Sequence, residues 1–172
     1  MSDFAPAISY VLTREGGLVN DPNDAGGVTN FGITLRFYKT IHPEAVAADI
    51  ESLTQDQAIS FYKIEFWDKT EFNLIENQLI ANMAFDMAVN MGIAPAIKTL
   101  QRACFSVRAQ YELFGDDGIL GEKTLGVLNS LDPCCLLSAI RSERAGVYRE
   151  IVAKEPLQRV FLEGWLRRSY NA

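Results

Sequence analysis

Glu15 occupies a position in the sequence that suits proton chemistry. It follows an apolar-periodic segment, and the turn-rich stretch GGLVNDPNDAGG comes directly after it. A carboxyl group in the last turn of a helix faces the negative end of the helix dipole, and partial burial also disfavours its charged form. Both effects favour a neutral carboxylic acid, which is what general acid catalysis of glycoside cleavage requires. Glu15 is therefore the candidate general acid.

A second carboxylate is needed to guide water or to stabilise developing positive charge across the cleft. Asp24, nine positions after Glu15, is the preferred candidate, and Asp21 is the alternative. The hydroxyl of Thr29 is a candidate for positioning a water molecule. These acidic and hydroxyl groups need no cofactor and no metal ion for such a reaction.

Other kinds of site fit this sequence poorly. Asp21, Asn23 and Gly26 match three positions of a calcium-binding EF-hand loop, but Gly32 stands where the loop needs its final glutamate. His42 is the only histidine and precedes a proline, which argues against histidine-based catalysis and against a zinc site.

The three cysteines are Cys104, Cys134 and Cys135. Their spacing matches neither a disulfide framework nor a CxxC metal site, and it predicts free buried thiols in a protein made in a reducing compartment.

Composition narrows the possible partners. The chain has 172 residues and a formal net charge of −6, which disfavours general nucleic-acid binding. No apolar run approaches the ~20 residues of a membrane span, so we expect no membrane insertion. The N-terminus lacks the basic and apolar regions of a signal peptide, so we expect synthesis in the cytoplasm.

Periodicity and capping residues predict a mainly α protein, with a small irregular β-hairpin in residues 18–33 after the first helix. Ser2 or Asp3 caps that helix, and Gly16-Gly17 ends it. Thr34 caps a short helix through LRFYKTI. A capping box of Thr54 with Gln57 starts a helix that carries Ile59, Tyr62, Ile64 and Phe66.

The later helices have equally clear boundary signals. ENQLIANMAFDMAVNMG is strongly helical and ends at Gly92, and Pro95 fits the first turn of the next helix. After the loop GDDGILGEKT a helix starts at Gly121. Asp132-Pro133 caps a longer helix, and Pro156 starts or kinks the last one.

Three polar residues, Asn82, Asp86 and Asn90, lie four apart on one face of the predicted helix that ends at Gly92. Asp86 and Asn90 either line a sugar cleft or tie this helix to a neighbouring loop. Tyr62 and Trp67 could stack on sugar rings, although aromatic residues at helical spacing are more often core. We favour Tyr62 for the cleft and Trp67 for the core.

The stretch REGGLVNDPNDAGGVTNFGIT resembles the signature of glycoside hydrolase family 108, a family of lysozyme-like N-acetylmuramidases of phage endolysins and bacterial wall-remodelling proteins. Further similar motifs follow in the same order: FYKIEFWD, FDMAVNMGIAPAIKTLQRA, DDGILGEKT and FLEGWLRR. The resemblance implies an α+β lysozyme-like fold, with Glu15 as the catalytic acid and Asp24 as its partner. The Glu-Asp-Thr order also resembles the phage lysozyme triad, with one residue fewer between Asp24 and Thr29.

From about Pro95 the chain resembles the family's C-terminal peptidoglycan-binding region, because LQRA…DGILGEKT is similar to the pattern of such modules. The expected organisation is a catalytic region at 1–93 and a helical peptidoglycan-binding-like region at 94–172. No linker composition separates them, so we expect the two to pack as one compact unit. A purely structural role for Asp117-Gly118 and Thr124 is the alternative explanation of this pattern.

The resemblance predicts a peptidoglycan hydrolase that cleaves the β-1,4 bond between N-acetylmuramic acid and N-acetylglucosamine. Asp86, Asn90 and Tyr62 are the expected substrate-binding residues, and peptidoglycan glycan strands are the expected partner of a monomer. The enzyme would act on the cell wall after release from the cytoplasm. The alternative is a catalytically inactive peptidoglycan-binding or secretion-assisting protein with the same fold.

Overall fold

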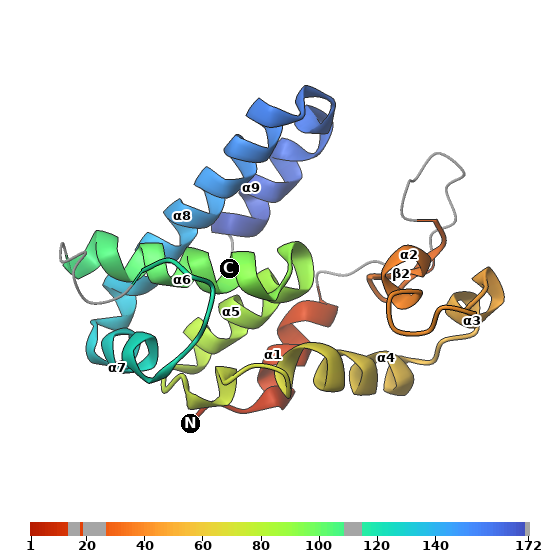
Figure 1. The fold of residues 1–172 in the computed structure, drawn as a ribbon, viewed down its shortest axis with the longest axis horizontal. Helices are drawn as coiled ribbons and strands as arrows, with labels where there is room; N and C mark the ends of the chain where they lie inside the picture. Colours follow the sequence, from red (N-terminus) through yellow and green to blue (C-terminus); the bar gives the residue numbers. More distant parts are fainter. Residues whose placement is uncertain (14–17, 19–26, 109–114, 171–172) are drawn as a thin grey trace.

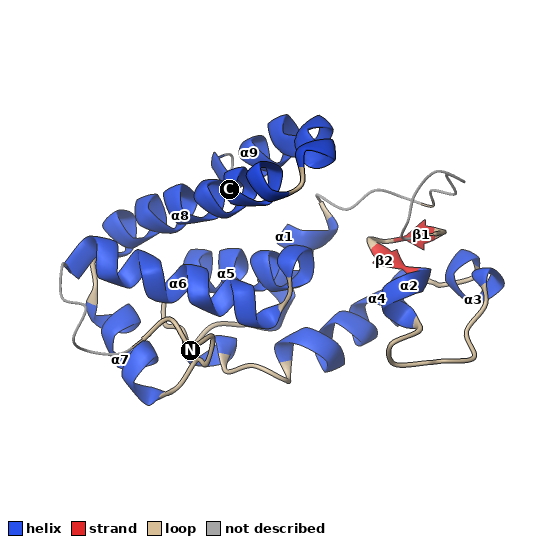
Figure 2. Cartoon of the chain, turned by 45° about the horizontal axis from the view of Figure 1, so that its top comes forward, coloured by secondary structure: helices blue, strands red, loops and turns tan. Residues whose placement is uncertain are grey.

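The structure, a computed structural model, describes residues 1–13, 18, 27–108 and 115–170. These residues are mostly helical and include one two-stranded antiparallel hairpin, as predicted (Figures 1 and 2). Along the chain the elements are α1 (Phe4–Leu12), β1 (Thr29–Asn30), β2 (Ile33–Thr34), α2 (Leu35–Tyr38), α3 (Ala47–Glu51), α4 (Gln55–Tyr62), the π-helix η1 (Lys63–Trp67), the 3-10 helix η2 (Phe72–Leu74), α5 (Gln78–Met91), α6 (Ile93–Arg108), α7 (Glu122–Ser130), α8 (Pro133–Lys154), the 3-10 helix η3 (Pro156–Phe161) and α9 (Leu162–Tyr170).

Helix α1 lies alongside α5 and runs in the same direction (Figure 1). At their starts, the Asp3 backbone N–H donates to the Gln78 side chain, 2.8 Å away. The ring of the next residue, Phe4, contacts that of Phe85, which lies further along α5. The last helical residue of α1 is Leu12, so the helix ends earlier than predicted; Gly16 and Gly17, the expected terminators, lie outside the described residues. The C-terminal ends of α1 and α5 therefore lie on the same side of the body.

The hairpin occupies the last part of the stretch in which it was predicted. Thr29 pairs with Thr34, and Asn30 pairs with Ile33. The turn residues Phe31 and Gly32 have φ angles of 50° and 79°, and two such left-handed residues in succession match the twist of a tight hairpin. The buried Asn30 amide donates to the carbonyl of Ile50, which fixes the hairpin against α3.

Predicted capping residues account for several helix boundaries. The Thr34 hydroxyl accepts from the Phe37 N–H, and Thr54 forms the expected capping box with Gln57. Gly92 ends α5 with a φ of 94°, a conformation that residues with a side chain rarely adopt. The Asp132 carboxylate accepts from the Cys135 N–H at the start of α8.

One apolar residue of the predicted helix does not enter the core. Ile64 is 57 % exposed. The helix changes here to π winding, in which the Asp68 N–H donates to the Lys63 carbonyl, five residues earlier. This wider turn shifts the buried face, so that Phe66 and Trp67 both enter the core.

The core of the N-terminal part is an aromatic cluster. Trp67 lies in it, as predicted, with its ring centroid 5.6 Å from those of Phe4 and Phe85. Tyr62 packs edge-on against Phe85, which is completely buried at the centre of the cluster. The cluster joins α1, the α4–η1 segment and α5, and so sets the positions of these elements.

The three cysteines are free, but only Cys104 is buried. Burial raises the pKa of its thiol to about 12, which keeps it protonated and unreactive. Cys134 and Cys135 are exposed in the first turn of α8, so the expectation that all three thiols are buried was wrong. Their sequence neighbour Leu136 takes the core position of this turn instead.

The pattern LQ…DG…T has a clear structural role. The buried Gln101 side chain on α6 donates to Asp117, to the Ile119 carbonyl and to Thr124, and it accepts from the Gly118 N–H at 3.0 Å. One side chain therefore holds the loop before α7 and the helix that follows it. Gly118 has a φ of 80°, and a Cβ there would lie 3.1 Å from the Ala94 carbonyl oxygen.

A buried cluster of charges joins the two parts of the chain. Asp86 on α5 has no exposed surface, and its carboxylate oxygens lie 2.7 Å from Arg144 on α8 and 2.7 Å from Arg168 on α9. The Arg144 side chain is also completely buried. Helix α6 packs against both α5 and α8, so the helices before and after residue 94 form one packed body.

Phe85→Ala is expected to destabilise the protein by about 3–5 kcal/mol, because it opens a cavity at the centre of the aromatic cluster. Chemical denaturation followed by circular dichroism measures the change in the free energy of unfolding. Leu157→Ala is the control, since Leu157 is 91 % exposed and its removal should change stability by less than about 0.5 kcal/mol. Equal effects of the two changes would contradict this assignment of the core.

Asp86→Ala is expected to cost about 3–5 kcal/mol of unfolding free energy, because it leaves Arg144 charged and buried without its partner. The matched control is Asp68→Ala, which removes an exposed ion pair with Lys63 and should have a much smaller effect. Denaturant titration of both variants at neutral pH makes the comparison. A stable Asp86→Ala variant would show that the buried pair is not what joins the helices.

Candidate functional site

A pocket of about 330 Å³ lies beside the C-terminal end of α5. The hairpin, α2, the α4–η1 segment and the α5–α6 junction all contribute to its wall. Its lining residues are Gly32, Ile33, Thr34, Phe37, Tyr62, Phe66, Ala88, Val89, Asn90 and Gly92. The wall is mainly apolar with a few polar groups, which is typical of sites that bind small organic ligands.

Two of the three predicted substrate-binding residues, Tyr62 and Asn90, line this pocket. Tyr62 is only 1 % exposed, and its hydroxyl donates to the Phe31 carbonyl 2.8 Å away. Its ring therefore supports the hairpin and forms part of the pocket wall. Asn90 stands in the last turn of α5 and is exposed. Whether either residue contacts substrate stays a prediction.

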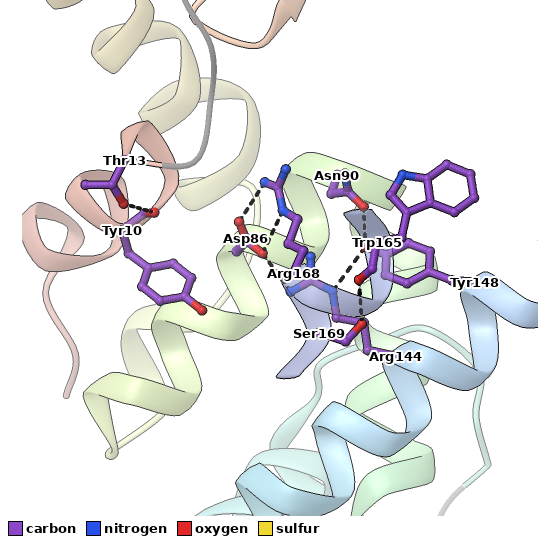
Figure 3. Close-up of polar contacts among 9 residues, drawn as sticks. All are labelled: Tyr10, Thr13, Asp86, Asn90, Arg144, Tyr148, Trp165, Arg168 and Ser169. Carbon is purple, nitrogen blue, oxygen red and sulfur yellow. Dashed lines mark hydrogen bonds and ion pairs between the residues drawn. The ribbon is translucent and has the colours of Figure 1, made fainter. Parts of the chain in front are cut away.

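Asn90 belongs to a chain of polar contacts that begins at Asp86 (Figure 3). Arg144 pairs with Asp86, and its Nε donates to the Tyr148 hydroxyl 3.1 Å away. The Tyr148 hydroxyl donates to the Asn90 side-chain oxygen. Asp86 and Asn90 are four residues apart on α5, and Arg144 and Tyr148 are four residues apart on α8, so each pair occupies one helical face.

Tyr148 is held firmly on both sides. Its ring stacks on Trp165 of α9 with the centroids 5.1 Å apart, and only 2 % of the residue is exposed. Burial raises the pKa of the Tyr148 hydroxyl, although Arg144 opposes the shift. The hydroxyl therefore keeps its proton at neutral pH and can donate it to Asn90.

Asp86 does not line the pocket, which corrects the expectation that it binds substrate. Its carboxylate is completely buried, and arginine side chains occupy both of its oxygens. Asp86 ties its helix to α8 and α9, whereas the alternative expected a tie to a neighbouring loop. Asn82, on the same face, is also buried and accepts from the Gln78 side chain.

Thr29, predicted to position water, lies half-buried in β1, and its hydroxyl donates to the Gly27 carbonyl at 3.3 Å. It is not among the residues that line the pocket. Glu15, Asp24 and the alternative Asp21 all lie outside the described residues, so their roles stay predictions. Helix α1 ends at Leu12, on the side of the body where α5 also ends (Figure 1).

Sequence reasoning did not identify Phe37 and Thr34 as pocket residues, or Tyr148 as the residue that contacts Asn90. A signal existed for the first two, because the Thr34 cap and the short helix after it were recognised without being related to a site. Tyr148 had no such signal, since it lies 58 positions from Asn90 and stands on a long helix with many charged residues.

Among the described residues, no group of three or more His, Cys, Asp or Glu side chains is arranged to hold a metal ion. None of the helices that the structure describes is both long enough and apolar enough to cross a bilayer.

Comparison with known proteins identifies two consecutive regions. Residues 8–92 match the family model described as glycosyl hydrolase 108, and residues 95–170 match the one described as a predicted peptidoglycan domain. No curated protein matches the chain.

The fold is also similar to that in a solved structure described as "Structure of Brucella abortus SagA". The two chains are 25% identical and superpose with a TM-score of 0.73, over 96% of this chain and 92% of the other. Along the chain, a region that matches glycosyl hydrolase 108 is therefore followed directly by a region that matches a predicted peptidoglycan domain.

Proposed function

We propose that this protein is a muramidase, which hydrolyses the β-1,4 bond between N-acetylmuramic acid and N-acetylglucosamine in peptidoglycan. The observation that carries the proposal is the glycosyl hydrolase 108 match, which spans Glu15 and Asp24 as well as the pocket at the end of α5. A peptidoglycan domain packed directly on that region supports peptidoglycan as the substrate.

In the proposed reaction Glu15 donates its proton to the oxygen of the leaving sugar. A second carboxylate, Asp24 or its alternative Asp21, stabilises the positive charge that develops on the ring or guides the attacking water. The chemistry requires that Glu15 be protonated while the second group is ionised, and differences in burial and hydrogen bonding produce this difference in proteins. Thr29 would act by positioning water.

The pocket would receive part of the glycan strand. Its apolar wall, which includes the tilted pair Phe37 and Phe66, suits the apolar face of a sugar ring, and Asn90 and Thr34 supply hydrogen-bonding groups. Because Asp86 is buried, the proposal assigns it to stability and gives it no contact with the glycan.

Glu15→Gln is expected to abolish hydrolysis of purified peptidoglycan while keeping the thermal unfolding temperature of the wild type, because glutamine cannot donate the proton. Release of reducing sugars measures the rate, and mass spectrometry of the digest identifies the bond that is cut. The matched control is Glu122→Gln, at the exposed start of α7, which should keep full activity.

Two outcomes would contradict the proposal. Full activity of Glu15→Gln would remove Glu15 from its role. Co-sedimentation of the wild type with insoluble peptidoglycan, without any release of sugars, would instead support a wall-binding protein that lacks catalysis.

A further inference from the structure

The side chain of Asn90 is fixed in one orientation by its neighbours. The Tyr148 hydroxyl oxygen accepts from Arg144 Nε, so its own proton must go to another group. That group is the Asn90 side chain, in which only the amide oxygen can accept a hydrogen bond. The Asn90 NH2 group is therefore the part of the amide that remains for the pocket. Within the described part of the chain it makes no hydrogen bond to protein.

The pocket thus combines a fixed donor with an apolar wall. Ile33, Phe37 and Phe66 line the pocket together with Asn90. A ligand group that fits this combination has a carbonyl oxygen to accept from Asn90 and a methyl group to contact the apolar side chains. A carboxylate fits less well, because the polar side chains of the wall, Asn90 and Thr34, are neutral. Arg144 and Arg168 are already paired with Asp86, and the chain has a net charge of −6.

We propose that the pocket beside Asn90 is a subsite for an acetamido group, with the carbonyl oxygen of an N-acetylated sugar accepting a hydrogen bond from Asn90 Nδ2. Tyr148, on the peptidoglycan domain, is the positioning residue that holds Asn90 as a donor, and Arg144 orients Tyr148. The inference rests on the proposed function for its substrate class. It adds that the C-terminal domain contributes to sugar recognition, because its Tyr148 holds the side chain of Asn90 in the pocket wall.

The geometry gives this arrangement a physical basis. Arg144 is completely buried and paired with Asp86, and Tyr148 is stacked on Trp165. Neither side chain can rotate without leaving a buried polar group unpaired, which is costly. Asn90 is therefore pre-organised as a donor before the sugar arrives, and little ordering entropy is lost when it binds.

The test measures binding in the Glu15→Gln background, so that no turnover is needed. The probes are the β-1,4-linked tetramer of N-acetylglucosamine and the same tetramer of glucosamine, which lacks the acetyl groups. Calorimetric titration should show that the N-acetylated tetramer binds more tightly. Asn90→Asp keeps an oxygen for Tyr148 but replaces the donor with an acceptor, so it should weaken binding of the N-acetylated tetramer by about 10- to 100-fold.

Tyr148→Phe distinguishes positioning from general support of the fold. It frees Asn90 to rotate, so affinity for the N-acetylated tetramer should fall by a smaller factor, while affinity for the glucosamine tetramer stays the same. A purely structural effect would weaken both ligands equally. Tyr170→Phe, which removes an exposed hydroxyl on α9, is the matched control and should change neither affinity.

Equal affinity of the two tetramers for the Glu15→Gln protein would overturn the acetamido subsite, as would unchanged binding by Asn90→Asp. If Tyr148→Phe does not fold, as thermal unfolding would show, Asn90→Asp alone decides, because its side chain is exposed. Failure of the proposed catalysis would give a different result. The wild type would then not hydrolyse peptidoglycan, while the protein would still bind the N-acetylated tetramer more tightly than the glucosamine tetramer.

Discussion

The buried carboxylate of Asp86 is the constraint on which the arrangement of this protein depends. A charge without access to water costs several kcal/mol unless oppositely charged groups and hydrogen bonds surround it. Here the opposite charges come from Arg144 on α8 and Arg168 on α9. These residues follow Asp86 by 58 and 82 positions in the sequence. The helices of the peptidoglycan domain must therefore dock on α5 whenever α5 is packed in the core.

This docking joins what the family matches separate into two regions. The boundary between them falls at the junction of α5 and α6, yet the polar contacts cross it from Asp86 to Arg144 and from Tyr148 back to Asn90. Gln101 meanwhile uses its amide to hold the loop and helix that carry the DG and T of the peptidoglycan-binding pattern. In this chain those motif residues organise the C-terminal helices.

Local chemistry made many features of the fold predictable. Thr34, Thr54 and Asp132 cap helices because their side chains accept from backbone N–H groups only a few residues away. Such interactions are complete within one turn, so sequence spacing is enough to identify them. The exceptions, Ile64 and the exposed thiols at the start of α8, depend on helix winding and on which face a neighbouring element covers. Spacing within one helix does not contain that information.

The sequence by itself determined the mainly helical class, the hairpin after the first helix, the end of α5 at Gly92 and the two family signatures, because each is encoded in a contiguous stretch. It also indicated that Asp86 and Asn90 share a helical face. Only the tertiary structure decided that their surroundings differ, with Asp86 buried against two arginines and Asn90 at the pocket. The reason is that burial and pairing are set by side chains on α8 and α9, which are far away in sequence and meet α5 only after the helices pack.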